Sequence, residues 1–326
     1  MDKTITFLVE DTDKNLRLDK FLTGNLNNFT RSQLKKIIIS KGVKIDNKIV
    51  VSASEKVKSG NVIKILIKAE ENNYIKPKRI ELDVVYEDKE LILINKPSGL
   101  TVHPGAGNKE NTLVNGLMSL YKKNLSSLNG PFRPGIVHRI DKETSGLLVV
   151  AKNNFSHAKL SEQFSSHTIK RKYIALVWGV IRPLRGKIET FLKRSTKNRQ
   201  LMSVNLFSGK KAVTNYKTLK VFNIKDIPKI SLIECVLETG RTHQIRVHLS
   251  YKGNSLLGDK KYGKKKLQFK KINEDFYKIL LNFNRQALHA KSLGFIHPKN
   301  NKPMSFDSKL PHDFKKMLDF LENFDN

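Results

Sequence analysis

The pattern of apolar and polar positions predicts a small N-terminal module built from a helix and short strands. Residues 30–42 place apolar side chains on one helical face, between a candidate capping box at Thr30 and Gln33 and a glycine that ends the helix. Residues 43–51 and 57–67 are interrupted by Asp-Asn and Gly-Asn pairs, which form turns, and their apolar content favours strands.

A polar segment separates this module from a longer region that contains apolar runs of strand length. The segment carries acidic residues, asparagines and a proline, which is the composition of a linker. A chain of 326 residues is long enough for two domains. We therefore expect an N-terminal domain over residues 1–68 with its core in 16–65, a linker over 69–79, and a larger domain over 80–326.

The charge of the chain indicates the kind of partner it binds. It has 61 Lys and Arg against 30 Asp and Glu, a net charge of +31, which predicts a polyanionic partner. The abundance of Lys, Asn and Ile is also typical of compositional drift, which accounts for part of this excess. The N-terminus does not resemble a signal peptide, and no apolar run approaches the roughly 18 residues that span a membrane. Cys235, the single cysteine, lies in an apolar run and suits a buried position in a cytoplasmic protein.

Residues 133–152 place one carboxylate, Asp141, between a polar loop and a short apolar run. The run, residues 147–151, predicts a strand that is buried on both faces. Donors are expected to gather around Asp141 from His138, Arg139, Lys142, Thr144 and Ser145. Two interpretations follow from these residues: Asp141 is a functional carboxylate, or it caps a turn whose other polar groups satisfy the local backbone.

The sequence lacks the motifs of a nucleotide-binding, metal-binding or hydrolytic site. Residues 99–107 are rich in glycine, but no phosphate-binding motif followed by a helix is present, so we expect no nucleotide site. His243 and His248 are five residues apart and do not converge on a strand or a helix, so with one cysteine we expect no metal site. Hydrolysis normally needs metal ligands or a second positioned carboxylate, and neither accompanies Asp141.

The string H-R-I-D-K-E-T-S-G with its apolar tail L-L-V-V-A-K resembles the central motif of the RluA-type pseudouridine synthases. The strings Y-E-D-K-E-L-I-L-I-N-K-P-S-G, R-K-Y-I-A-L-V-W-G, L-E-T-G-R-T-H-Q-I-R-V-H and N-R-Q-A-L-H-A resemble further motifs of this family, and L-R-L-D-K-F-L with T-R-S-Q-L-K-K resembles the S4 RNA-binding module. The resemblance implies an α+β fold: a catalytic domain with a mixed, largely antiparallel sheet around a central cleft, and a small N-terminal S4 domain.

The resemblance also implies roles for particular residues. Asp141 would attack C1′ of the nucleotide or remove the C2′ proton, and the sequence leaves both routes open. Tyr173, by its position an ordinary strand aromatic, would be the active-site tyrosine, and Arg241 would pair with Asp141 and orient it. Arg139 would fill the space that a flipped nucleotide vacates. In the S4 module, RNA-binding residues would be Arg17, Arg31, Lys35, Lys36 and Lys41.

The resemblance implies an isomerase that converts uridine to pseudouridine at specific sites of 23S ribosomal RNA and needs no cofactor or metal. The strings V-H-P-G-A-G-N and N-R-Q-A-L-H-A look most like the branch that modifies the helix-69 stem-loop. The alternatives are other uridines of 23S ribosomal RNA or transfer RNA, and a non-enzymatic S4-type ribosome assembly factor. We expect a cytoplasmic monomer whose partner is large-subunit ribosomal RNA or its precursor particle, and no membrane association.

Overall fold

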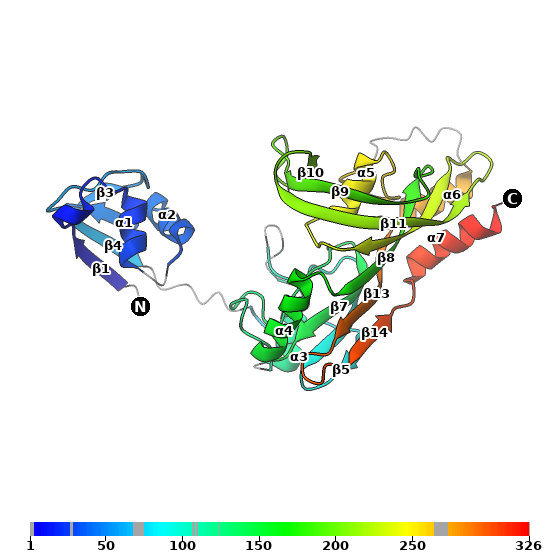
Figure 1. Cartoon of the computed structure of the whole chain (residues 1–326), viewed down its shortest axis with the longest axis horizontal. Coiled ribbons are helices and arrows are strands. Elements are labelled where there is room, and N and C mark those ends of the chain that lie inside the picture. Colours follow the sequence, from blue (N-terminus) through cyan, green and yellow to red (C-terminus); the bar gives the residue numbers. More distant parts are fainter. Residues whose placement is uncertain are drawn as a thin grey trace. The chain divides into compact units, whose positions relative to one another are not determined.

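The chain forms two compact units, Met1–Tyr74 and Ile75–Asn326 (Figure 1). The computed structural model describes residues 3–26, 29–67, 75–105, 108, 110–122, 124–263 and 273–325. Most of the predicted linker, its residues 69–74, lies outside the described residues.

In the N-terminal unit, two helices accompany an antiparallel sheet with strand order β1-β4-β2-β3. Its elements are β1 (Lys3–Leu8), the 3-10 helix η1 (Asp11–Asp13), α1 (Leu18–Asn25), α2 (Arg31–Ile39), β2 (Val43–Ile45), β3 (Lys48–Val50) and β4 (Val62–Ile67). Leu22 and Ile38 of the helices are buried with Val43 and Ile65 of the sheet, so the unit has its own apolar core.

Helix α2 begins as the sequence predicted but does not end at the predicted glycine. Thr30 and Gln33 form the predicted capping box. Gly42, however, does not occupy the left-handed position that ends the helix, because Lys41 does so with φ 65°. The Gly42 amide instead donates to the Ile37 carbonyl at 2.9 Å, and a Cβ on this glycine would meet the Ile37 side chain. The glycine is therefore needed for close packing one residue after the turn.

A buried carboxylate in this unit ties together two arginines that were predicted to bind RNA. The Asp19 side chain is 3% exposed and accepts hydrogen bonds from Arg17 at 3.1 Å and from Arg31 at 2.8 Å. These bonds, Arg17 first, lower the pKa of Asp19 to about 2. Both arginine side chains remain about half exposed. The two guanidinium groups are therefore held together at the surface of the unit.

We expect Asp19→Asn to destabilise the N-terminal unit by about 1–2 kcal/mol near neutral pH, because a neutral amide holds the two half-exposed guanidinium groups less strongly. The folded-state pKa lies below the unfolded value of about 3.9, so the carboxylate stabilises the fold above that value and loses this effect as the pH falls toward 2. Urea unfolding of the full chain at several pH values measures this difference. Glu55→Gln, which changes an exposed acid of the same unit, is the control. A difference between wild type and Asp19→Asn that does not shrink in acid would contradict the prediction.

The second unit is built on a mixed, largely antiparallel sheet, as predicted. The order of its described strands is β10-β9-β11-β12-β8-β13-β7-β6-β5, with β14 paired to β13. Strands β7 and β13 form the parallel pair among them. The strands are β5 (Val84–Glu87), β6 (Leu91–Lys96), β7 (Ser145–Ala151), β8 (Lys170–Trp178), β9 (Arg185–Arg194), β10 (Met202–Asn205), β11 (Lys210–Phe222), β12 (Ile230–Leu237), β13 (Leu288–Ile296) and β14 (Pro303–Asp307).

Strand β7 lies in the middle of the core and is buried along its whole length, as its apolar run predicted. Leu148 and Val150 pack in the cluster that includes α3 and α5, whereas Leu147 and Val149 pack on the other face beside α4. At Gly146, φ is +113°, and a Cβ would overlap the Ala290 carbonyl of β13. Glycine therefore allows the close parallel pairing at the point where the Asp141 loop enters the strand.

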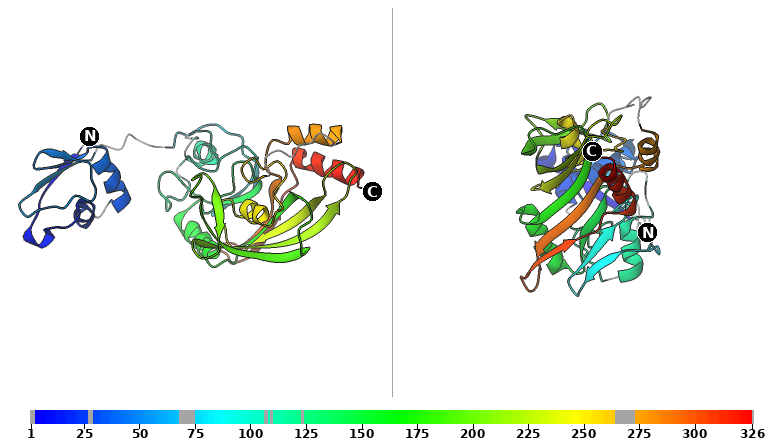
Figure 2. Two further views of the ribbon diagram at one scale, coloured as in Figure 1. Left: turned by 90° about the horizontal axis from the view of Figure 1, so that it is seen from above. Right: turned by 90° about the vertical axis from the view of Figure 1, so that its right-hand side faces the viewer.

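Helices cover the sheet and close one end of the unit. They are α3 (Leu113–Tyr121), α4 (Asn154–Ser165), α5 (Gln244–Tyr251), α6 (Glu274–Asn282) and α7 (His312–Asn323). Helices α6 and α7 lie side by side (Figure 2), with the rings of Phe276 and Phe320 5.9 Å apart. In the described part of the chain, no helix has both the length and the apolar character needed to cross a membrane.

Candidate active site

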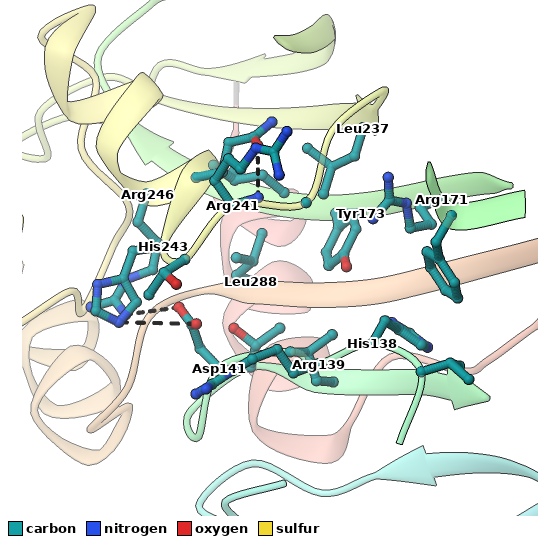
Figure 3. A pocket seen from close by; sticks show the side chains of 18 of the residues that line it. His138, Arg139, Asp141, Arg171, Tyr173, Leu237, Arg241, His243, Arg246 and Leu288 are labelled. Atoms are coloured by element: carbon teal, nitrogen blue, oxygen red, sulfur yellow. Dashed lines mark hydrogen bonds and ion pairs between the residues drawn. The ribbon is translucent and has the colours of Figure 1, made fainter. Parts of the chain in front are cut away.

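A pocket of about 480 Å³ lies between the Asp141 loop, the end of α4, strand β8 and the start of α5 (Figure 3). It brings together Asp141, Tyr173 and Arg241, which lie far apart in the sequence, and Arg139 also lines it. Apolar walls come from Val137, Ile140, Leu237, Ile245 and Leu288. The pocket therefore combines a carboxylate, a phenol and basic groups with apolar surface that suits a flat ring.

The Asp141 carboxylate does not cap a local turn. The backbone carbonyl of Asp141 closes the turn by accepting from the Thr144 amide at 3.1 Å. Thr144 accepts from the Gln286 side chain at 3.1 Å, and the Ser145 hydroxyl lies 3.0 Å from His289 Nδ1. The expectation that these hydroxyls gather around the carboxylate is therefore wrong, because they anchor the loop to β13 and to the residue Gln286 shortly before it. The Asp141 side chain is left to project into the pocket.

A buried lysine bonds to the backbone of the Asp141 loop. The ammonium group of Lys96, which is fully buried, donates to the carbonyls of Pro97, Leu100 and Lys142 at 2.7, 2.8 and 3.0 Å. Its three protons are thus all used. Burial lowers the pKa of Lys96 to about 7. Lys96 therefore fixes the carbonyl that follows Asp141 and helps to keep the carboxylate in one position.

The partner of Asp141 is Arg246, which is itself held by a second carboxylate. Nη1 of Arg246 donates to Asp141 Oδ2 at 2.9 Å. Nε and Nη2 of the same side chain donate to the two oxygens of Asp259, both at 2.8 Å. Burial opposes the charge on Arg246, but Asp259 and Asp141 together raise its pKa. The Asp259 side chain is fully buried whereas that of Asp141 is 16% exposed. Asp259 therefore anchors the Arg246 guanidinium, which in turn holds the Asp141 carboxylate toward the pocket.

The sequence therefore predicted the wrong arginine as the partner of Asp141. Arg241 lines the pocket, but its Nε donates to the Lys211 carbonyl at 3.0 Å, and its backbone amide donates to the Gln244 side chain at 3.0 Å. Helix α5 begins at Gln244, so Arg241 precedes the helix and Arg246 lies in its first turn. The sequence around these two arginines does not reveal where helix α5 starts. This start determines which arginine faces the Asp141 loop.

His243 is a second residue of the site that sequence reasoning missed. Its Nε2 lies 4.0 Å from Asp141 Oδ1, and its Nδ1 lies 2.8 Å from the Tyr262 hydroxyl. That hydroxyl also accepts from the Met202 amide at 2.8 Å, so Tyr262 holds the imidazole beside the carboxylate. Burial lowers the pKa of His243, which favours the neutral imidazole.

The spacing of the two missed residues, His243 just before α5 and Arg246 within it, offered a signal. His243 and Arg246 are three apart, so they share one face if the string is helical. His248 instead lies 3.0 and 2.9 Å from the hydroxyls of Thr190 and Thr214 in the core, so the two histidines do not converge. Within the described residues, no group of three or more His, Cys, Asp or Glu side chains is arranged to hold a metal ion.

Tyr173 and two arginines complete the pocket. Tyr173 is 7% exposed on β8, and burial raises the pKa of its hydroxyl. Two residues earlier on the same face of β8, Arg171 is buried, donates to the Glu238 carbonyl at 3.1 Å and lies over the Phe164 ring. Arg139 is exposed, with its guanidinium 3.4 Å from Nε2 of His103. The lining of the pocket thus carries positive charge and a phenol hydroxyl that stays protonated near neutral pH.

Comparison with known proteins agrees with this geometry. A family model described as RNA pseudouridylate synthase matches residues 90–251, and one described as S4 domain matches residues 16–63. The chain is 44% identical over 308 residues to "Ribosomal large subunit pseudouridine synthase D" of Zymomonas mobilis, which covers 94% of this chain and 93% of that protein. It is 38% identical over 327 residues to the protein of the same name from Haemophilus influenzae, with coverage of 99% and 98%. The solved structure of "Human RNA Pseudouridylate Synthase Domain Containing 4" is similar with a TM-score of 0.56 and 27% identity over 74% of this chain and 93% of that one.

Proposed function

The chain belongs to the RNA pseudouridylate synthase family and isomerises uridine to pseudouridine in RNA, and from this premise we propose that its substrate is 23S ribosomal RNA. Two relatives that align over nearly their whole length are named as synthases of the large ribosomal subunit, which supports this substrate. Membership in an enzyme family overturns the alternative of a non-enzymatic assembly factor. Within 23S ribosomal RNA we propose the helix-69 stem-loop, on the strength of the V-H-P-G-A-G-N and N-R-Q-A-L-H-A strings.

The reaction breaks the N1–C1′ bond of uridine and joins C1′ to C5 of the same base. C5 loses a proton and N1 gains one, so the product is an isomer of the substrate. The enzyme must place a carboxylate beside the sugar, retain the free base while it turns, and move a proton from C5. The observation that carries the proposal is the Asp141 carboxylate, which projects into the pocket and is oriented by Arg246.

We propose that Asp141 acts on the sugar, either by forming a bond to C1′ or by removing the C2′ proton. Tyr173 would lie against the base, with Leu237 and Leu288 as further apolar surface that retains it. Its raised pKa makes the hydroxyl a poor base by itself, so it would take the C5 proton only as its own proton passes to another group. Arg241 remains a proposed substrate contact at the pocket, without the predicted bond to Asp141.

Tyr173→Phe is expected to lower kcat by about 10²-fold, a typical contribution of one proton-transfer group, with little change in RNA affinity. The phenyl ring keeps the surface on which the base packs, whereas the hydroxyl is lost. Single-turnover rates and RNA binding, measured separately, test this expectation. Tyr173→Leu should weaken both the rate and the retention of the base. An unchanged rate for Tyr173→Phe would show that the hydroxyl takes no part in the reaction.

Binding of the remaining RNA is proposed to involve exposed basic residues of both units. Arg139 lies at the pocket and would occupy the space that the flipped nucleotide leaves. In the S4 domain the proposed phosphate contacts are Arg17, Arg31, Lys35, Lys36 and Lys41, all of which are exposed. With ribosomal RNA or a precursor of the large subunit as its partner, we propose that the protein acts in the cytoplasm as a monomer.

The substrate proposal is tested by mapping pseudouridines in ribosomal and transfer RNA from cells that carry either the wild-type chain or Asp141→Asn. Loss of pseudouridine in the helix-69 loop alone would support the proposed target. Loss at other uridines of 23S ribosomal RNA, or in transfer RNA, would replace that target and leave the chemistry in place.

A further inference from the structure

The aromatic side chain of Phe207 is almost entirely exposed to solvent. It is 91% exposed in the loop that connects β10 to β11, and Leu206 beside it is 61% exposed. The turn that carries it is built by Asn205, whose side-chain oxygen accepts from the amides of Phe207 at 3.0 Å and Ser208 at 2.7 Å. These bonds order the turn, so the backbone that carries the exposed ring has a defined conformation.

The strands before and after this loop contact the wall of the active-site pocket. Met202 and Val204 of β10 pack with Val247 of α5, the helix whose first turn carries Arg246. After the loop, in β11, the Lys211 carbonyl accepts from Arg241, which lines the pocket. Lys211 is four positions after Phe207, a span of at most about 14 Å of chain. Figure 1 shows β10 beside β9 and α5 in the upper part of the second unit.

The surroundings of Phe207 indicate the chemistry of its partner. Residues 190–216 contain six basic residues and no acidic residue. The basic residues are Lys193, Arg194, Lys197, Arg199, Lys210 and Lys211. Of these, Lys211 is paired with Glu189, which lies just before this range, at 2.6 Å. An exposed aromatic ring among cations suits a partner that carries both negative charge and flat apolar faces, which single-stranded or looped RNA offers in its phosphates and unpaired bases. A protein surface would have to supply many carboxylates around an apolar cavity to match it equally well.

We propose that Phe207 stacks on an unpaired base of the substrate RNA, outside the pocket and within a few nucleotides of the uridine that enters it. This proposal rests on the RNA substrate of the proposed function. The ring makes Phe207 a recognition residue, whereas Asp141 and its neighbours carry out the reaction. The basic side chains of this region hold the phosphates while the Phe207 ring fixes the position of the RNA loop.

The test compares Phe207→Ala, Phe207→Trp and a control, Phe155→Ala, in the full chain. Phe155 is also an exposed phenylalanine, at 55%, but it lies at the start of α4 and does not line the pocket. The probe is a synthetic RNA stem-loop that the wild-type chain modifies. Loss of one stacked base is expected to weaken binding of Phe207→Ala by about 5- to 100-fold. The rate at saturating RNA and the melting temperature should stay unchanged, and Phe207→Trp and Phe155→Ala should bind as the wild type does.

Two further measurements distinguish base stacking at position 207 from phosphate binding by the basic side chains. The chain already carries Trp178, so the emission that Phe207→Trp adds to that of the wild type is the signal. This added fluorescence should be quenched when the RNA binds, because an indole that stacks on a base loses its emission. The salt dependence of binding should keep its slope in Phe207→Ala, whereas Lys210→Met should reduce the slope by about 0.7 to 0.9 per lost phosphate contact.

Equal binding of the stem-loop by Phe207→Ala and wild type, or fluorescence that does not respond to RNA, would overturn the proposal. These results would leave the proposed function intact, because the wild-type chain would still form pseudouridine. If the wild-type chain formed no pseudouridine in any ribosomal or transfer RNA, the proposed function itself would fail. The two failures are therefore distinguishable.

Discussion

Asp141→Asn is expected to reduce pseudouridine formation by about 10³- to 10⁴-fold, because an amide neither attacks C1′ nor removes the C2′ proton. The change preserves the size of the side chain, and one amide oxygen still accepts from Arg246, so the loop should keep its place. RNA affinity should change by less than about threefold, since Asp141 provides no phosphate contact. Single-turnover assays and direct binding to the same RNA measure the two effects.

A neighbouring carboxylate provides the matched control for this prediction. Glu143 lies two residues away in the same loop, and its side chain, 38% exposed, is near Lys142. Glu143→Gln removes the same charge and should leave the rate within about twofold, as is usual for surface substitutions. If Asp141→Asn retained full activity, the catalytic role of this carboxylate would be wrong, whatever the family resemblance implies.

Arg246→Gln is expected to affect both the stability and the rate. It leaves Asp259, whose side chain is fully buried, without its charged partner, and such a change costs about 3–5 kcal/mol. It also frees Asp141 from the bond that orients it, so we expect a rate at least about 10²-fold lower. Thermal unfolding and single-turnover rates, measured on the same samples at a temperature where the variant is folded, separate the two consequences.

Two companion variants identify the cause of these losses. Arg241→Gln changes an arginine of the same pocket that donates to a backbone carbonyl, so it should cost less than about 1.5 kcal/mol and leave Asp141 in place. Arg246→Gln combined with Asp259→Asn removes the unpaired buried charge and should regain most of the stability without regaining the rate. If Arg241→Gln proved the more damaging of the two arginine changes, the arrangement seen in the structure would not be the one that operates in catalysis.

The features that the sequence predicted correctly are determined by neighbouring residues. The capping box of Thr30 and Gln33 spans one helical turn, and Asp46 and Asn47 adopt the positive φ values of a tight turn between β2 and β3. The burial of β7 on both faces follows from its unbroken apolar run. The placement of Asp141 and Tyr173 in one pocket was available only through the resemblance, because 32 positions and a helix separate them.

The errors concern contacts between residues that are distant in the sequence. Asp141 and Arg246 are 105 positions apart, and which arginine meets the carboxylate depends on where α5 begins and how its first turn is oriented. Gln244 determines that start, since its side chain bonds to the Val213 carbonyl and to the amide of Arg241. Asp259 and Tyr262 lie beyond the helix, in a lysine-rich stretch without any recognisable pattern. No local rule connects these residues.

The chemical groups, the local elements and the positive charge of this protein can be read from the order of its residues, because propensity, turn geometry and net charge depend on residues near one another or on simple sums. The tertiary structure alone decided that Arg246 orients Asp141, that Asp259 anchors Arg246, and that His243 lies beside the carboxylate. A charged side chain pairs with the group that folding brings within hydrogen-bonding distance, and packing of the sheet and helices sets that distance.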